Sequence, residues 1–535
     1  MQKLAGLVFL ITSISVQATD PYPKNDAIDV KHYTFQLEVN DSTNVISGQA
    51  TIVISFNKEV ADFELDLANK NERAEGMEII QIVSGENKLR FTHQHDRIRI
   101  FLSPSARAHD QLTFMIYYNG IPRDGLTIGK NKFGDRGFFG DNWPDRGHHW
   151  LPVVDHPSDK ASVDFIVIAP LDYSVVANGI KTEESPIDSK RKLTHWHEEI
   201  DIPVKVMVVG IARFAIQYVG KVDDISVESW VYPQNRDEGF HDYAVGLKIL
   251  DYFHHHIGPY PYKKLANVQS KTRWGGLENA NTIFYSENLV SGRGEQEPII
   301  AHEEAHQWFG DSATEKDWHH VWLSEGFATY FANLYLEYTY GRDRLVEDQK
   351  TDRVQVIRYF DKNRAPVVDT TIRDINLILN TNTYQKGGWV LHMLRHQVGD
   401  SAFWKGIQQY YTTYRNGNAL TSDFQRVMEE VSGTSLSVFF NQWLYRGGHP
   451  RLSVSWTFDA KAKALNISIS QVQKGPIFKT PLDIAIMTAD GKTELKTFSL
   501  ESKTQKFTVP IASKPLDLLL DPNTWLLFEG KIEAK

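Results

Sequence analysis

Two histidines four positions apart, His302 and His306, constrain the fold of this 535-residue chain more than any other feature. On an α-helix, residues at i and i+4 share one face, so both imidazoles can bind the same metal ion. A third candidate ligand, Glu325, lies in the segment 322–336, which is also predicted to be helical. Two antiparallel helices joined by a loop near residues 311–318 would place this carboxylate opposite the imidazoles.

The donor set itself indicates which metal this site would hold. Two neutral nitrogens and one carboxylate suit zinc and leave a fourth position for water, which is typical of catalytic sites and not of structural ones. Glu303 would then lie beside that water as a general base. Without Glu325 the His-Glu-His pattern would be a moderate signal, because a solvated helix can carry the same residues. With it, we predict one zinc ion bound by His302, His306 and Glu325.

Length and composition limit the class of protein. A chain of 535 residues, 41% hydrophobic and 23% charged, is typical of a globular protein with about three domains. A net charge of -9 and the lack of long basic runs argue against nucleic acid as a partner. The chain has no cysteine, which excludes disulfides, thiolate ligands and a cysteine nucleophile. None of these features predicts the oligomeric state.

The N-terminus is typical of an export signal. Lys3 precedes a mostly apolar segment, 4–16, and small residues offer cleavage after Ala18. This segment is shorter than the roughly 20 residues that span a bilayer, although an uncleaved anchor is the alternative. We therefore expect residues 1–18 to be a signal peptide and the protein to be periplasmic or secreted. We expect no integral membrane segment after signal removal.

The spacing of hydrophobic residues changes along the rest of the chain and divides it into three segments. Alternating runs predict an N-terminal all-β domain of sandwich or saddle type over 19–220. A stretch rich in Gly, Asp, Trp and His, 125–156, interrupts it. Because it is long for a structureless loop, we expect it either to be functional or to cross to the next domain. The segment 221–447 combines strands with helices, and 448–535 returns to alternation, as in a small β-sandwich.

Within the middle segment, helical spacing predicts one helix over 237–257. The run His254 to His256 is not expected to bind one metal ion, because consecutive helical residues point about 100° apart. Thr421 or Ser422 is expected to cap a later helix.

Three motifs together make the chain resemble the gluzincin aminopeptidases, the group that contains aminopeptidase N and leukotriene hydrolase. The first is HExxH with its distant glutamate; the second is a Gly-x-Met-Glu-Asn motif, here residues 275–279; the third is a Tyr-x-Lys-Gly motif, here 384–387. The resemblance covers nearly all of the mature chain. It implies a multidomain α+β protein with an N-terminal antiparallel β domain, a thermolysin-like zinc catalytic domain and a C-terminal β-sandwich.

The resemblance also implies an activity: a zinc-dependent aminopeptidase that hydrolyses the first peptide bond of peptides with a free N-terminus. Tyr384 would stabilise the oxyanion, and Glu278 would pair with the α-ammonium of the substrate. Gly275, Gly276 and Asn279 would complete the substrate-binding segment, with the glycines allowing close approach of the peptide backbone.

Some positions depart from the family pattern. Leu277 replaces a methionine, and Ser324 replaces a common asparagine with little expected effect. Trp143 stands where many members carry a second amine-binding residue, so that contact is either lost or supplied by Asp141 or Asn142. The indole would narrow the first pocket or stack on a substrate side chain.

Two other functions stay open at this level. A zinc endopeptidase with an open cleft is favoured by the absence of the large helical C-terminal domain of many members, but Glu278 argues against it. A catalytically inactive binding scaffold is disfavoured by the intact metal-binding and catalytic residues. Lys386 is interpreted either as a solvated helix residue or as a residue that orients the loop of Tyr384.

Overall fold

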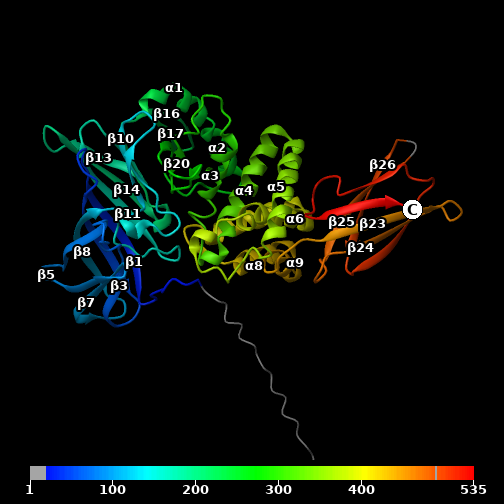
Figure 1. Cartoon of the computed structure of the whole chain (residues 1–535), viewed down its shortest axis with the longest axis horizontal. Helices are drawn as coiled ribbons and strands as arrows, with labels where there is room; N and C mark the ends of the chain where they lie inside the picture. Colours follow the sequence, from blue (N-terminus) through cyan, green and yellow to red (C-terminus); the bar gives the residue numbers. More distant parts are fainter. Residues whose placement is uncertain (1–19, 489–490) are drawn as a thin grey trace, which may run out of the picture.

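The structure, a computed structural model, describes residues 20–488 and 491–535. Figure 1 shows three parts in chain order: a β-rich N-terminal part, a largely helical centre and a β-rich C-terminal part. This arrangement confirms the predicted multidomain α+β class. The expected signal peptide, 1–18, lies outside the described residues. Among the helices that are described, none is long and apolar enough to cross a membrane.

The N-terminal part is built on an eight-stranded sheet in the order β13-β14-β11-β1-β2-β8-β4-β5. Its pairs are antiparallel except β1 with β11, which are parallel. Side chains alternate between core and surface along β1, where Tyr33, Phe35 and Leu37 are buried, as the period-two pattern predicts. The strands are β1 (Ile28–Glu38), β2 (Ile46–Phe56), β4 (Gly76–Ser84), β5 (Asn87–Lys88), β8 (Gln111–Ile121), β11 (Lys160–Pro170), β13 (Ile180–Pro186) and β14 (Arg191–Pro203).

Two smaller sheets complete this part. A three-stranded sheet has the order β3-β7-β6, and a four-stranded sheet has the order β12-β15-β10-β9. The latter includes a hairpin inside 125–156, so this stretch is not a structureless loop, in keeping with its length. Asn131 closes the turn of this hairpin, because its Oδ1 accepts from the backbone N–H groups of Phe133 and Asp135. The strands are β3 (Val60–Asp66), β6 (Arg90–Gln94), β7 (Arg97–Ala106), β9 (Leu126–Lys130), β10 (Arg136–Gly140), β12 (Ser174–Ala177) and β15 (Val209–Ala212).

The central part begins with a five-stranded sheet in the order β16-β17-β18-β20-β19. The predicted boundary at 220 falls inside β16, which pairs with β17, so the sheet of the central part starts at Ala215. The short strand β19 forms one edge, antiparallel to β20. The strands are β16 (Ala215–Val222), β17 (Ile225–Val231), β18 (Lys264–Ser270), β19 (Gly276–Leu277) and β20 (Thr282–Ser286).

Helices form the rest of the centre. They are α1 (Arg236–Tyr243), α2 (Gly246–His256), α3 (Glu297–His306), α4 (Trp322–Tyr340), α5 (Arg342–Lys362), α6 (Gly387–Val398), α7 (Asp400–Tyr414), α8 (Thr421–Ser432) and α9 (Ser437–Leu444). The single helix predicted over 237–257 is two helices, α1 and α2. Gly246 begins the second helix in close contact, since a Cβ there would lie 2.5 Å from both Asn267 Nδ2 and Glu304 Oε1.

The predicted helix cap at Thr421 or Ser422 was also wrong. Leu420 is the N-cap residue of α8, and its backbone N–H donates to Asp423 Oδ2 at 2.9 Å. The hydroxyl of Thr421 instead accepts from Trp322 Nε1 at 2.8 Å, which ties α8 to the start of α4. A tertiary contact therefore uses the side chain that local sequence rules assign to the cap.

The C-terminal part consists of two sheets, in the orders β27-β24-β23-β29 and β26-β25-β28. Alternating buried side chains on β23 and β24, among them Leu452, Val454, Leu465 and Ile467, belong to its core. The strands are β23 (Arg451–Asp459), β24 (Ala464–Gln471), β25 (Thr480–Met487), β26 (Thr493–Leu500), β27 (Thr504–Pro510), β28 (Asp517–Leu520) and β29 (Glu529–Ala534).

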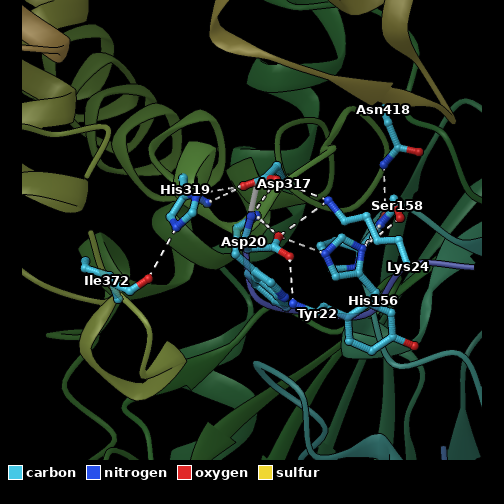
Figure 2. A network of polar contacts seen from close by, with 11 residues as sticks. Asp20, Tyr22, Lys24, His156, Ser158, Asp317, His319, Ile372 and Asn418 are labelled. Atoms are coloured by element: carbon cyan, nitrogen blue, oxygen red, sulfur yellow. Dashed lines mark hydrogen bonds and ion pairs between the residues drawn. The ribbon is translucent and has the colours of Figure 1, made fainter. Parts of the chain in front are cut away.

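The first described residues tie the N-terminal part to the centre (Figure 2). The backbone N–H of Asp20 donates to Asp317 Oδ2 at 3.1 Å, and the Asp20 carboxylate accepts from the backbone N–H of Trp318 at 3.0 Å. His156 Nε2 lies 2.9 Å from the same carboxylate, and Lys24 Nζ lies 3.1 Å from Asp317. Most of these contacts are buried, so three distant segments are fixed at one point.

We predict that Asp317→Asn weakens this junction in a pH-dependent way. Burial alone would raise the pKa of Asp317, but hydrogen bonds from His319 and from the Asp20 backbone hold the pKa well below its usual range. A carboxylate with a lowered folded-state pKa stabilises the protein above its unfolded pKa, and that stability is lost as pH falls through the folded pKa. The Tm of Asp317→Asn should therefore lie roughly 2–6 °C below wild type at neutral pH.

Thermal unfolding measured from neutral pH down to about pH 3 checks this prediction, because the gap should narrow below about pH 4. Asp224→Asn is the matched control, since Asp224 is exposed and has only a distant ion pair with Lys221. A gap that stays constant over the whole range would contradict the assignment.

Candidate metal centre and its cavity

Helices α3 and α4 bring the three predicted metal ligands together. The Nε2 atoms of His302 and His306 lie 3.1 Å apart. Glu325 Oε2 lies 3.5 Å from the first and 3.3 Å from the second. The structure thus places one donor atom from each residue around a common point, as the spacing on two facing helices predicts.

These donor distances fit a zinc ion. Zinc binds nitrogen and oxygen donors at about 2.0–2.2 Å in a tetrahedron, which puts neighbouring donors roughly 3.3 Å apart. Glu325 Oε2 is buried and has no hydrogen-bond partner among the described residues. A buried carboxylate oxygen that faces two imidazoles is suited to binding a cation.

The charges around the centre also favour a cation. Burial alone would lower the pKa of His306, but the carboxylates of Glu325 and Glu278 raise it to about 10. Burial, together with Glu278 and Glu325, raises the pKa of Glu303 well above its usual range, and His306 opposes this. Three carboxylates therefore surround two imidazoles in a region that excludes most solvent, and Glu303 is able to hold a proton.

His306 is oriented by contacts on its far side. Its Nδ1 lies 3.2 Å from the backbone carbonyl of Phe309 and 3.0 Å from Ser324 Oγ. A proton on Nδ1, donated to that carbonyl, leaves the Nε2 lone pair facing the metal centre. Ser324, expected from the sequence to matter little, therefore contacts a metal ligand directly. The first turn of α4 creates that contact, so spacing alone does not reveal it.

A cavity of about 400 Å³ opens over the centre, and Glu303 and Tyr384 both line it. Tyr384 lies in a π-helical turn, Asn382–Lys386, and its ring stacks on His302 with centroids 5.9 Å apart. Burial and three nearby glutamates raise the pKa of Tyr384 well above its usual range. Its hydroxyl consequently keeps its proton near neutral pH and serves as a hydrogen-bond donor.

Glu278 lines the same cavity and is 5% exposed. One of its carboxylate oxygens lies within 4.8 Å of donor atoms of both Glu303 and His306. Its Oε1 is buried and has no partner within the described part of the chain. The segment is fixed to α3, because Gln307 Nε2 donates to the Glu278 backbone carbonyl at 2.9 Å. Sequence reasoning missed Gln307, whose role depends on this contact across the fold.

The two glycines beside Glu278 differ. A Cβ on Gly276 would lie 2.2 Å from Glu303 Oε1, so this position tolerates only glycine without moving the acid. A Cβ on Gly275 would meet its nearest atom, on Leu289, at 4.0 Å, and this residue borders the open cavity. The structure thus places both glycines at the cavity, but only Gly276 packs on Glu303.

Asn279 lies elsewhere than the sequence predicts. It is fully buried and does not line the cavity. Both of its amide atoms lack a hydrogen-bond partner among residues 20–488 and 491–535. Its side chain therefore belongs to the interior and does not border the cavity.

Trp143 forms part of the cavity wall and is supported from outside the centre. Its ring meets Trp318 edge-on, with centroids 5.5 Å apart. Lys205 Nζ lies 5.7 Å from the first ring and 5.5 Å from the second, and pairs with Glu315 at 2.6 Å. Because the Asp20 carboxylate accepts from the backbone N–H of Trp318, the N-terminal segment supports this wall.

The structure does not favour Asp141 or Asn142 as a second amine-binding residue. Asp141 is buried and ion-paired with Arg146. Asn142 donates to the backbone carbonyls of Val204 and Met207 at 3.0 and 2.8 Å. Neither residue lines the cavity. Of the residues considered from the sequence as contacts for the substrate amine, Glu278 is the carboxylate that lines the cavity.

Comparison with known proteins covers most of the chain. Residues 29–204 match the peptidase M1 N-terminal domain, and residues 242–443 match the peptidase family M1 domain. Similar proteins include probable aminopeptidase 2 of Sulfurisphaera tokodaii, 25% identical over 358 residues, which are 63% of this chain and 45% of the relative. Bovine glutamyl aminopeptidase is 27% identical over 332 residues, 59% of this chain and 34% of the relative. Aminopeptidase M1 of Arabidopsis thaliana is 25% identical over 371 residues, 66% of this chain and 41% of the relative. The chain thus spans less than half the length of these relatives.

We predict that Ser324→Ala lowers the affinity for zinc by about tenfold, because the removed hydroxyl helps to orient His306, and such supporting contacts are typically worth 10-fold to 100-fold. Titration of the metal-free protein with zinc against a competing chelator measures the effect. The exposed Ser502→Ala serves as the control. Equal zinc affinities for Ser324→Ala and wild type would show that the Phe309 carbonyl alone orients the imidazole.

Proposed function

Because the chain belongs to peptidase family M1, we propose that it is a zinc-dependent aminopeptidase that releases the first residue of peptides with a free N-terminus. One observation carries this proposal: Glu278, a buried carboxylate without a partner for its Oε1 among the described residues, lies beside a set of three zinc-type ligands in one cavity. Such a site can bind an ammonium group close to the reacting bond.

Glu278 fixes the register of the substrate. A charge-assisted hydrogen bond from the α-ammonium to its carboxylate places the first residue in the cavity and the first peptide carbonyl over the metal centre. The edge strand β19, Gly276–Leu277, lies directly before it and offers backbone groups for pairing with an extended peptide. A substrate without a free amine would leave Glu278 buried and unpaired.

Glu303 and Tyr384 carry the proton transfer and the charge stabilisation. Zinc bound by the three ligands would supply a Lewis acid and a water of lowered pKa. Burial raises the pKa of Glu303, so its ionised carboxylate has a high affinity for a proton; it would accept one from the attacking water and deliver it to the leaving amine. The Tyr384 hydroxyl donates a hydrogen bond to the oxyanion.

The cavity walls favour an apolar first residue. Trp143, Trp274, Ile299 and Leu379 supply apolar surface, and no lysine or arginine lines the cavity within the described residues. An acidic first side chain would therefore lack a counter-charge there. The similarity to glutamyl aminopeptidases accordingly does not by itself extend to a preference for glutamate.

We predict that free aminoacyl reporters are hydrolysed and that their N-acetylated forms are not. Leucyl and phenylalanyl reporters should exceed the glutamyl reporter in kcat/KM, and a chelator should abolish turnover. Glu278→Gln should raise KM for free substrates and lower kcat/KM by about 100-fold, because it removes a buried charge pair.

The same panel separates the alternatives. Hydrolysis of acetylated and free substrates at similar rates would indicate an endopeptidase. A protein that neither retains zinc nor hydrolyses any reporter would indicate a binding scaffold.

We predict that Glu303→Ala and His306→Ala fail in different ways. Glu303→Ala should keep zinc and lose at least about 100-fold in kcat, because the general base is gone while the ligands are intact. His306→Ala should lose both zinc and hydrolysis, since it removes a ligand. Zinc content per protein chain and kcat, measured on the same samples, check this. Wild-type activity in Glu303→Ala would contradict the mechanism.

A further inference from the structure

A second cavity, of about 370 Å³, lies where the central and C-terminal parts meet, and it shares no lining residue with the first. The cavity is lined by the end of α5, the turn after α9, the start of β23 and the connection between β24 and β25. Its basic lining residues are Arg364, Arg446, His449, Arg451 and Lys474. We propose that this cavity binds a multivalent oxyanion, namely a phosphate group.

The nearby carboxylates neutralise only part of this charge. Glu529 Oε1 lies 2.8 Å from Arg451 Nε and 2.6 Å from His449 Nε2. Asp361 pairs with the same arginine at 3.0 Å. Of the other cations that line the cavity, none has a carboxylate within 4.0 Å in the described part of the chain; these are Arg364, Arg446 and Lys474.

Arg446 is held in place before any ligand binds, and Arg364 faces an aromatic ring. Arg446 Nη2 donates to the Ile477 carbonyl at 2.8 Å, and its guanidinium lies 4.3 Å from the ring centroid of Phe478. The guanidinium of Arg364 lies 5.8 Å from the ring centroid of Phe360. Planar donors fixed on aromatic faces lose little entropy when they bind a tetrahedral oxyanion.

Two glycines make this arrangement possible. A Cβ on Gly447 would lie 2.1 Å from the Arg364 backbone carbonyl, and Gly448 has a φ of +99°. The turn after α9 can therefore run directly against the segment after α5. This close approach brings Arg446 and Arg364, far apart in sequence, to one cavity.

The electrostatics support the same inference. Lys386 is a buried lysine, 2% exposed, that lies close enough to Arg446 to be affected by its charge. Burial and the charge of Arg446 lower the pKa of Lys386 to about 7. Burial also lowers the pKa values of Arg446 and His449, although Glu529 opposes it at His449. Positive charge is thus under-compensated here, and a bound anion would stabilise it.

The excess of charge selects the class of anion. Three cations without carboxylate partners match a dianion better than a single carboxylate, and arginine binds phosphate through two parallel hydrogen bonds. The ligand would contact both the central and the C-terminal parts, so its binding should stabilise the junction between them.

Inorganic phosphate is the probe, and the Tm of the zinc-loaded protein is the measurement, at constant ionic strength. Wild type should show a saturable rise in Tm with phosphate and no such rise with acetate. Arg446→Gln and Arg364→Gln should each need about tenfold more phosphate for half of the rise, the loss expected for one charge-assisted contact. Arg107→Gln is the control: Arg107 is exposed and belongs to the N-terminal part, which does not line this cavity, so this variant should behave as wild type.

Three outcomes would overturn the proposal: no saturable effect of phosphate, an equal effect of acetate, or an unchanged phosphate dependence in both cavity variants. The last would place phosphate at another site, such as the metal centre. Because Arg364 is exposed, its variant keeps the test valid if Arg446→Gln does not fold. The readout is binding, so the result does not depend on the proposed peptidase activity.

Discussion

The packing of α3 against α4 is the contact on which the rest of the structure depends. It places the carboxylate of Glu325 against two imidazoles in a buried site, where charges of opposite sign interact strongly and an unpaired one is costly. The elements around this pair hold it from several sides. The segment of Glu278 is bonded to the end of α3 through Gln307, and the first turn of α4 is tied to α8 through Trp322 and Thr421. The metal centre is thus held in place by residues such as Gln307 and Thr421, which have no role in the proposed reaction.

Features set by local spacing were predictable from the sequence. The face shared by His302 and His306 follows from helical geometry, and the strands of the N-terminal part follow from alternation such as that of Tyr33, Phe35 and Leu37. The order of the motifs was enough to predict that Glu278 and Tyr384 lie in the same cavity as the three predicted metal ligands. These features depend on residues close in sequence, or on a family pattern.

Features set by contacts between distant segments were not predictable. The hydroxyl of Thr421 accepts a hydrogen bond from Trp322 Nε1 instead of capping its own helix. Ser324 Oγ contacts His306 Nδ1 only because α4 begins where it does. Asn279 is buried between β19 and β20, and the next residue, Ala280, is bonded through its backbone to Val206 and Asn178 of the N-terminal part, a contact that no local rule supplies. In each case a polar side chain has several possible partners, and the tertiary fold decides among them.

The contact between Gly276 and Glu303 has a consequence for how such a protein can diverge. The strand edge offered to a ligand and the acid of the metal centre touch each other, so a side chain added at that edge would displace the acid. Trp143, by contrast, packs against Trp318 and Lys205, and its indole N–H has no hydrogen-bond partner among the described residues. Variation during evolution, or in a directed library, can therefore reshape the Trp143 wall while leaving the reacting groups in place. The glycine edge offers no such freedom.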